Sequence, residues 1–166
     1  LNHYLKPVYN FIYRLSGPSE AEDLTQETFL KAWKNLKKYQ PEKSFKTWLF
    51  AIARNTAIDY LRRKKIPVFS DFETAAGDNF LLDTLADTEP WPDEILAKSQ
   101  GKEWVNNLLE KLPPQYKEVL LLYYGESMTF EEVGQILKKP LNTVKSQHRR
   151  ALLALRQILN APKTPL

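Results

Sequence analysis

Hydrophobic residues along most of this chain recur every three or four positions, the spacing that places them on one face of an α-helix. The clearest case is residues 45–65, where an apolar residue returns at every fourth position. The same period covers residues 5–15 and 19–38, and it returns over residues 102–159. The pattern therefore predicts an all-α fold.

Turn and capping signals divide the first half of the chain into three predicted helices. Ser16-Gly17-Pro18 is a turn that ends the first helix. Ser19 is followed three residues later by Glu22, which predicts a capping box at the start of the second helix. The apolar stripe of that helix continues as far as Trp33 and beyond, and residues 39–44 form a loop before the central helix.

A helix, a tight turn and a longer helix are predicted near the C-terminus. Thr129 and Glu132 have the spacing of a second capping box, and Lys138-Lys139-Pro140 interrupts the helical period. Gly134 lies inside the first helix of this pair, where glycine costs ~1 kcal/mol relative to alanine. We therefore expect a neighbouring backbone to pack closely against Gly134.

The net charge of +4 conceals three segments of different sign. Residues 1–65 contain 13 Lys and Arg against 6 Asp and Glu, residues 66–101 contain one against 8, and residues 102–166 contain 10 against 6. Two basic modules joined by an acidic connector suggest two surfaces that face a polyanion. Because the connector has no persistent helical period, we expect two small domains, residues 1–66 and 102–166, joined by a flexible acidic linker over residues 67–101.

Composition excludes several classes of function. The chain has no cysteine, so it contains neither disulfides nor cysteine-based zinc sites. His3 and His148 are isolated from other candidate ligands and are interpreted as ordinary polar residues. No nucleophile with its base, phosphate-binding glycine loop or metal cluster is recognisable, so we expect no enzyme activity and no cofactor. Without an apolar run of membrane-spanning length or a secretory signal, a cytoplasmic location is expected.

The central helix has a second face suited to unpaired nucleic acid. Trp48, Asn55, Asp59 and Arg62 recur at intervals close to whole helical turns. An aromatic ring stacks on an unpaired base, an amide hydrogen-bonds to its edge and a guanidinium group holds the backbone. Residues 62–65 are four consecutive cations, more than the helix dipole alone would favour. This face therefore indicates binding of single-stranded nucleic acid.

The longer C-terminal helix presents donors suited to duplex DNA. Its early residues are placed to enter a major groove, and its cations are placed to hold phosphates. An ordinary helical hairpin with a solvated basic face is the alternative, but capping box, small residue and turn proline together favour DNA binding. The candidate DNA-binding residues are Thr143, Lys145, Ser146, Gln147, Arg149 and Arg150.

Asp23, Gln26 and Glu27 form an acidic patch on the second helix of an otherwise basic module. Acids near a helix N-terminus stabilise the helix dipole, which explains Glu20 and Glu22. The other three residues are interpreted as a surface for contact with another protein.

Four motifs, in the same order, resemble those of the bacterial sigma factors, in particular the two-domain extracytoplasmic function (ECF) type. The resemblance covers nearly the whole chain. The matching stretches are Ala21-Glu22-Asp23-Leu24-Thr25-Gln26-Glu27-Thr28-Phe29, Thr47-Trp48-Leu49-Phe50-Ala51-Ile52-Ala53-Arg54-Asn55, Leu112-Pro113-Pro114-Gln115-Tyr116 and Thr143-Val144-Lys145-Ser146.

The resemblance implies a role for each candidate surface. Asp23, Gln26 and Glu27 would contact the clamp helices of the polymerase largest subunit. The central helix would melt the promoter, with Asn55 helping to hold a base flipped from the minus-ten element and residues 40–44 walling its pocket. The C-terminal helix pair would read the minus-thirty-five element. The minus-ten set implied in this way is Trp48, Arg54, Asn55, Arg62 and Arg63.

The partners implied by the resemblance are core RNA polymerase, promoter DNA as duplex and as melted strand, and an anti-sigma factor that holds the protein at the membrane. Two alternatives remain: a conventional helix-turn-helix regulator that uses residues 112–159 without polymerase, and a protein that sequesters another protein. Four positions depart from the family pattern: Lys138, Asn142, Gln147 and His148. Lys138 replaces the usual turn glycine, at a cost of ~1 kcal/mol if its φ is positive. Gln147 replaces a common arginine, so promoter specificity is expected to differ.

Overall fold

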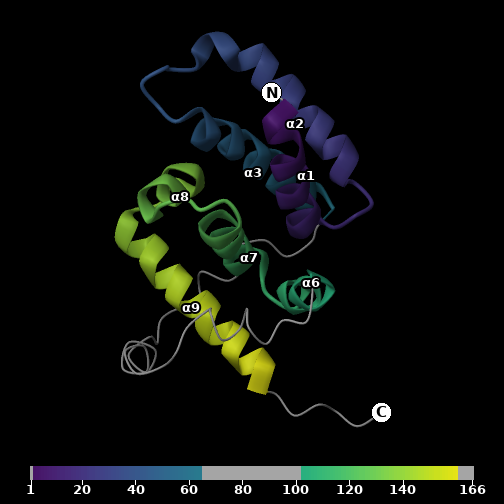
Figure 1. Cartoon of the computed structure of the whole chain (residues 1–166), viewed down its shortest axis with the longest axis vertical. Coiled ribbons are helices and arrows are strands. Elements are labelled where there is room, and N and C mark those ends of the chain that lie inside the picture. Colours follow the sequence, from purple (N-terminus) through teal and green to yellow (C-terminus); the bar gives the residue numbers. More distant parts are fainter. Residues whose placement is uncertain (1, 65–101, 161–166) are drawn as a thin grey trace.

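The computed structural model describes residues 2–64 and 102–160, and within these two ranges every regular element is a helix (Figure 1). This confirms the predicted all-α class and its two helical units. The predicted acidic linker, residues 67–101, lies wholly outside the described residues. The N-terminal unit contains α1 (Asn2–Ser16), α2 (Ala21–Asn35), the 3-10 turn η1 (Leu36–Lys38) and α3 (Phe45–Arg63). The C-terminal unit contains α6 (Lys102–Glu110), α7 (Pro114–Leu120), the π-helical turn η4 (Leu121–Gly125), α8 (Phe130–Leu137) and α9 (Leu141–Asn160).

In the N-terminal unit, α1 and α2 pack against each other and against α3. The every-fourth stripe of α3 is buried from Leu49 to Leu61, as its hydrophobic period predicts. Phe11 of α1 meets Phe50 of α3 with ring centroids 5.5 Å apart and an interplanar angle of 66°. Edge-to-face aromatic pairs of this kind add to the stabilisation from apolar burial. The predicted central helix is therefore the shared wall of a three-helix bundle.

The predicted capping box at the start of α2 is wrong. The helix begins at Ala21, and its N-cap is Glu20, whose side chain makes no capping hydrogen bond. Gly17 has a φ of +94°, so the chain turns sharply there, and the first helical backbone bond runs from Leu24 N to Glu20 O. Ser19 consequently lies one residue outside the position from which a hydroxyl accepts from the first helical turn.

The second capping box is confirmed at the start of α8. Thr129 Oγ1 accepts a hydrogen bond from Glu132 N at 3.2 Å, and Glu132 Oε2 accepts one from Thr129 N at 2.8 Å. The helix ends at Leu137, and its C-cap Lys138 has a φ of 54°, in the left-handed region, which the sequence had left open. Lysine therefore adopts a conformation that favours glycine, which costs roughly 1 kcal/mol.

Gly134 explains how α8 and α9 approach each other. A Cβ atom at this position would lie 2.8 Å from the backbone oxygen of Lys139 and 3.6 Å from a methyl carbon of Val144. A real Cβ does not tolerate the first of these distances. The close backbone approach predicted from the sequence is therefore present, and it allows the turn between the two helices to be tight.

His148 of α9 lies in an aromatic cluster and is not the ordinary polar surface residue that the sequence suggested. Tyr123 and Phe130 stack with centroids 4.4 Å apart, and the His148 ring packs edge-on against both at 5.0 Å. His148 Nε2 is hydrogen-bonded to Tyr124 Oη at 2.9 Å. Burial lowers the pKa of His148 to about 4, so the ring is neutral at pH 7.

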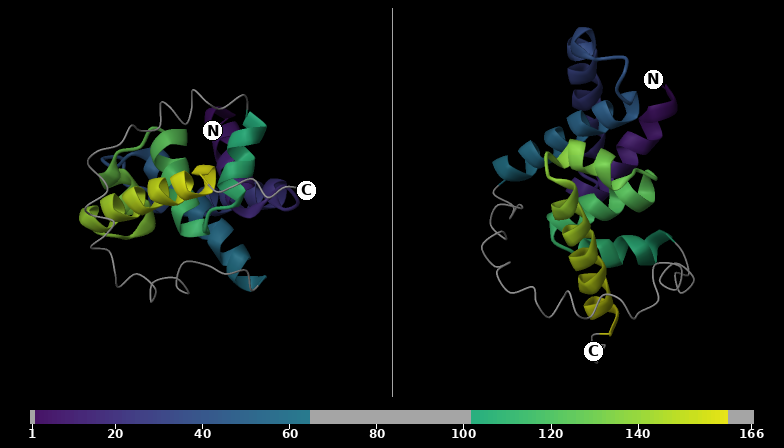
Figure 2. Two further views of the ribbon diagram at one scale, coloured as in Figure 1. Left: turned by 90° about the horizontal axis from the view of Figure 1, so that it is seen from below. Right: turned by 90° about the vertical axis from the view of Figure 1, so that its left-hand side faces the viewer.

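The two helical units pack against each other along α3. α8 lies against α3, and α7 lies against α1 (Figures 1 and 2). Two ion pairs cross this interface, Arg54–Glu118 and Lys46–Glu126. The sequence left the relative placement of the units open, and in this arrangement the N-terminal and C-terminal units form one packed body.

Replacing Gly134 by alanine should destabilise the C-terminal unit by roughly 1–3 kcal/mol, because the new Cβ must displace the backbone at Lys139. Thermal unfolding followed by circular dichroism measures the effect. Gly125→Ala is the matched control, since no atom lies within 4 Å of its Cβ position. Equal unfolding temperatures for the two variants would contradict the close approach at Gly134.

Lowering the pH should destabilise the fold through His148. Its pKa is about 4 when folded and ~6.5 when unfolded, so the unfolded chain takes up the proton first, and stability is lost progressively as the pH falls from 6.5 to 4. Between pH 7.5 and 5 the melting temperature of wild type should fall about 5 °C further than that of His148→Phe. His3→Gln, which alters the exposed histidine of α1, should respond like wild type. An identical pH response of wild type and His148→Phe would contradict the assignment.

Candidate polymerase and DNA interface

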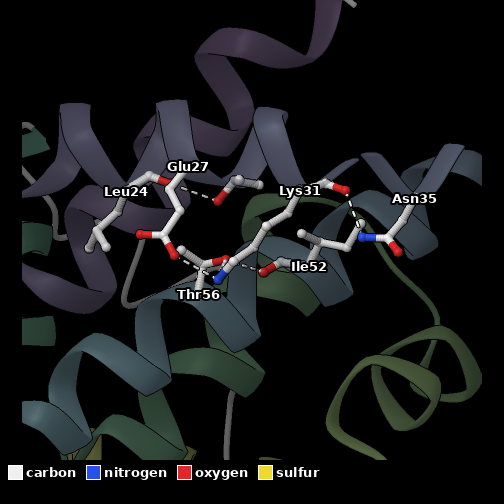
Figure 3. A network of polar contacts seen from close by, with 7 residues as sticks. Leu24, Glu27, Lys31, Asn35, Ile52 and Thr56 are labelled. Atoms are coloured by element: carbon white, nitrogen blue, oxygen red, sulfur yellow. Dashed lines mark hydrogen bonds and ion pairs between the residues drawn. The ribbon is translucent and has the colours of Figure 1, made fainter. Parts of the chain in front are cut away.

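The predicted acidic patch lies on α2 and is held in place by α3. Asp23 and Gln26 are exposed, and Glu27 is half-buried. Glu27 forms an ion pair with Lys31 one turn later, at 2.7 Å between Oε1 and Nζ. Lys31 Nζ also lies 3.3 Å from Thr56 Oγ1 of α3, so the acidic face is tied to the central helix (Figure 3). α2 therefore presents Asp23, Gln26 and Glu27 from a fixed position.

An apolar groove adjoins this patch, and it was missed by sequence reasoning. It has a volume of about 430 Å³, and Trp33 is 70 % and Leu30 60 % exposed. The hydrophobic period assigned Trp33 to the inward stripe of α2, but the buried residues of that helix are Ala21, Leu24, Thr25, Thr28 and Ala32. Exposed apolar patches on soluble proteins mark interaction sites. The groove is lined by Gln26, Phe29, Leu30, Ala32, Trp33, Leu36, Phe45 and Trp48.

The N-terminal end of α3 carries an aromatic cluster next to the predicted loop. Ser44 caps the helix by accepting a hydrogen bond from Thr47 N. Trp48 packs against Phe45 and against Tyr39, with ring centroids 5.5 Å and 5.3 Å away. Tyr39 Oη donates to the carbonyl of Lys43 at 2.6 Å, which closes the loop on itself. Trp48 is thus brought beside the loop that the resemblance assigns to the base pocket.

The predicted minus-ten residues do not all share one environment. Asn55, Arg62 and Arg63 are exposed along α3, and Trp48 is half-buried at its start. Arg54 instead faces the C-terminal unit, where its Nε and Nη2 donate to Glu118 Oε2 and Oε1 at 2.9 and 3.3 Å. In this arrangement the Arg54 side chain is only 14 % exposed and is not presented to solvent with the others.

Glu118 is almost fully buried, with 1 % of its side chain exposed. Burial raises the pKa of Glu118, and the guanidinium of Arg54 opposes that increase by charge and by hydrogen bonding. Lys139 and Arg62 also lower the pKa of this carboxyl. A single buried carboxyl is therefore surrounded by the positive charge of three side chains.

The recognition helix α9 presents most of its predicted DNA-binding residues outward. Thr143, Lys145 and Ser146 are exposed, while Arg149 and Arg150 are half-buried. The expected outward position of Gln147 is wrong, since its side chain is 5 % exposed and its Oε1 accepts no hydrogen bond from any described residue. The reason is helical spacing: Gln147 lies three residues after buried Val144 and four before buried Ala151, so it falls on the inward stripe.

Within residues 2–64 and 102–160, no three acidic, histidine or cysteine side chains are grouped as metal ligands would be. None of the helices in the described part of the chain is both long and apolar enough to span a membrane.

Comparison with known proteins assigns both helical units. The Sigma-70 region 2 family matches residues 1–66, and the Sigma-70 region 4 family matches residues 108–157. The N-terminal half thus corresponds to sigma region 2, so the alternative of a conventional helix-turn-helix regulator is not favoured. A similar fold occurs in the sigma factor RpoE, solved in complex with the anti-sigma factor NepR from Bartonella quintana. That chain is 22 % identical, with a TM-score of 0.71 and coverage of 98 % of this chain and 96 % of RpoE.

Relatives at higher identity extend over almost the whole chain. The ECF RNA polymerase sigma factor SigW of Bacillus subtilis is 32 % identical over 158 residues, covering 94 % of this chain and 84 % of SigW. The RNA polymerase sigma factor YlaC of the same organism is 31 % identical over 155 residues, covering 93 % of this chain and 86 % of YlaC. The chain therefore belongs to the ECF RNA polymerase sigma factors, which bind core polymerase and direct it to promoters.

Proposed function

We propose that this sigma factor has three binding surfaces, one for polymerase and two for promoter DNA. The observation that carries the proposal is the order of the two sigma regions, each on its own helical unit. Two modest DNA contacts on one chain raise each other's effective concentration once polymerase sets their separation. The α2 face binds polymerase, α3 holds the melted minus-ten strand, and α9 reads the minus-thirty-five duplex.

The polymerase contact is assigned to Asp23, Gln26 and Glu27, together with the apolar groove beside them. Gln26 belongs to both, so polar patch and groove are continuous on α2. An apolar centre with a polar rim is the usual composition of a stable protein interface. Trp33 and Leu30 are therefore the candidate anchors of this contact, since large aromatic side chains supply much of the binding energy at interfaces.

The DNA contacts are assigned to different ends of the molecule. On α3, Trp48 stacks on an unpaired base and Asn55 reads its edge, while Arg54, Arg62 and Arg63 hold the backbone. This pocket binds only the melted state, so it shifts the duplex toward opening. On α9, the residues that face base edges and phosphates are Thr143, Lys145, Ser146, Arg149 and Arg150. Gln147, which is buried, would act from the inward side of the helix by positioning its neighbours.

Two further features are part of this proposal. The protein acts as an initiation factor that makes and breaks no covalent bond, so it is not an enzyme and needs no cofactor. Its proposed location is the cytoplasm. An anti-sigma factor is the proposed regulator, supported by the likeness of this fold to RpoE, which was solved with the anti-sigma factor NepR. Such a partner would hold the protein inactive at the membrane.

Run-off transcription with core polymerase on genomic fragments tests the polymerase contact. Promoter-specific starts should appear with the wild-type protein and fall at least roughly tenfold when Asp23, Gln26 and Glu27 are all changed to alanine. Glu22→Ala removes a neighbouring exposed acid on α2 and should retain activity. Full activity of the triple variant would refute the assignment, and DNA binding without any transcription would favour the regulator alternative.

The base-reading role of Asn55 is tested by promoter melting. Asn55→Ala should leave binding to core polymerase intact but lower the melted fraction roughly tenfold, because about 1.4 kcal/mol of contact with the unpaired base is lost. Permanganate reactivity of unpaired thymines measures the melted fraction. Asn10→Ala, an exposed amide on α1, is the control and should melt promoters normally. Normal melting by Asn55→Ala would remove this residue from the pocket.

A further inference from the structure

Two carboxyl groups of the C-terminal unit meet two cations of α3 at the interface between the units. Glu118 of α7 accepts both hydrogen bonds from Arg54. Glu126, just after η4, accepts a hydrogen bond on its backbone oxygen from Lys46 Nζ at 2.6 Å, with its carboxylate 3.5 Å from the same atom. Lys46 and Arg54 are eight residues apart, about two helical turns, so they project from one face of α3.

The Arg54–Glu118 pair has the geometry with which an arginine binds a phosphate. Two parallel N–H donors of one guanidinium bind two oxygens of one anion, and this bidentate form suits carboxylates and phosphates alike. The pair is also the more buried of the two, with side-chain exposures of 14 % and 1 %, against 36 % and 13 % for Lys46 and Glu126. Glu118 therefore occupies the donors that a DNA phosphate would take.

Positive charge from three side chains favours the ionised form of the Glu118 carboxyl. Arg54, Arg62 and Lys139 all act electrostatically on this group. Arg54 and Arg62 belong to the candidate minus-ten surface, while Lys139 comes from the turn between α8 and α9. A positive cluster of this kind is suited to an anion of higher charge, such as a nucleic acid backbone.

We propose that Glu118 acts as an internal substitute for a DNA phosphate in the free protein. Its pair with Arg54 holds the two helical units together and withholds Arg54 from promoter DNA until the units separate. The inference rests on the proposed function in one respect, the assignment of Arg54 to DNA. A partner that binds the separated arrangement, as polymerase would when it spaces the two units, shifts the population and releases the arginine.

The conformational part is tested on the free, full-length protein by distance measurements between spin labels. Because the chain has no cysteine, Lys37→Cys and Gln157→Cys, both at exposed positions in different units, provide unique labelling sites. The labelled protein with Glu118 and Arg54 intact should give one narrow distance distribution, because the packed units hold the two labels at a fixed separation. Glu118→Gln and Arg54→Gln should each move the distribution to longer, broader distances, whereas Glu131→Gln, which removes an exposed carboxylate from α8, should not.

The DNA part is tested by fluorescence anisotropy with a labelled single-stranded oligonucleotide and no polymerase. Glu118→Gln should bind at least fivefold more tightly than wild type, because Arg54 is released. Glu131→Gln carries the same change in net charge and should gain less than twofold. The double variant Arg54→Gln/Glu118→Gln should lose the gain, because the released group is then absent.

The outcomes distinguish the conformational part of the proposal from its DNA part. Unchanged distances in both Glu118→Gln and Arg54→Gln, with helical content retained, would overturn the proposal that this pair holds the two units together. Since the two substitutions lie in different units, misfolding of one variant leaves the other to decide. Longer distances without a gain in DNA affinity would overturn the assignment of Arg54 to DNA, and the withholding role with it. Transcription that depends on Asp23, Gln26 and Glu27 would stand in either case.

Discussion

The buried ion pair between Arg54 and Glu118 joins the two halves of this protein. A carboxylate that is almost inaccessible to water is stable as an ion only when hydrogen-bonded cations replace its hydration, and here a guanidinium from the other unit does so. Removing one partner of such a pair typically costs about 3–5 kcal/mol, because the remaining charge is buried without compensation. The contact therefore couples the packing of the two units to the availability of Arg54, one arginine of the candidate DNA surface.

Three faces of the central helix α3 lie in three different environments. Its every-fourth apolar stripe is the wall of the N-terminal bundle, the face with Lys46 and Arg54 receives the C-terminal unit, and Asn55 remains open to solvent. A helix has room for this because its period of 3.6 residues distributes neighbouring residues around the axis. Adjacent residues such as Arg54 and Asn55 can thus have opposite availability, one enclosed by an interface and the other free to bind.

The proposed polymerase surface on α2 differs from the interface on α3, because it is exposed. The acidic patch of α2 is fixed by Lys31, which bridges Glu27 to Thr56 on α3, and the exposed Trp33 and Leu30 extend the same surface with apolar area. A family assignment covering both sigma regions explains why such a surface remains uncovered in the protein by itself, since a sigma factor works only in association with core polymerase. The uncovered groove on α2 and the enclosed Arg54 on α3 thus occur in the same packed arrangement of the two units.

Local spacing along the chain was enough to predict the helical class, the capping box at Thr129 and the close approach at Gly134. Each of these features depends on residues within a few positions of one another. The order of the sigma motifs is equally a property of the chain alone, so the family could be recognised without the fold. Packing between distant segments, by contrast, leaves Trp33 exposed and pairs Arg54 with Glu118. These outcomes depend on which of several amphipathic faces meets a partner 64 residues away in the chain, as Glu118 is from Arg54, and no local pattern encodes that choice.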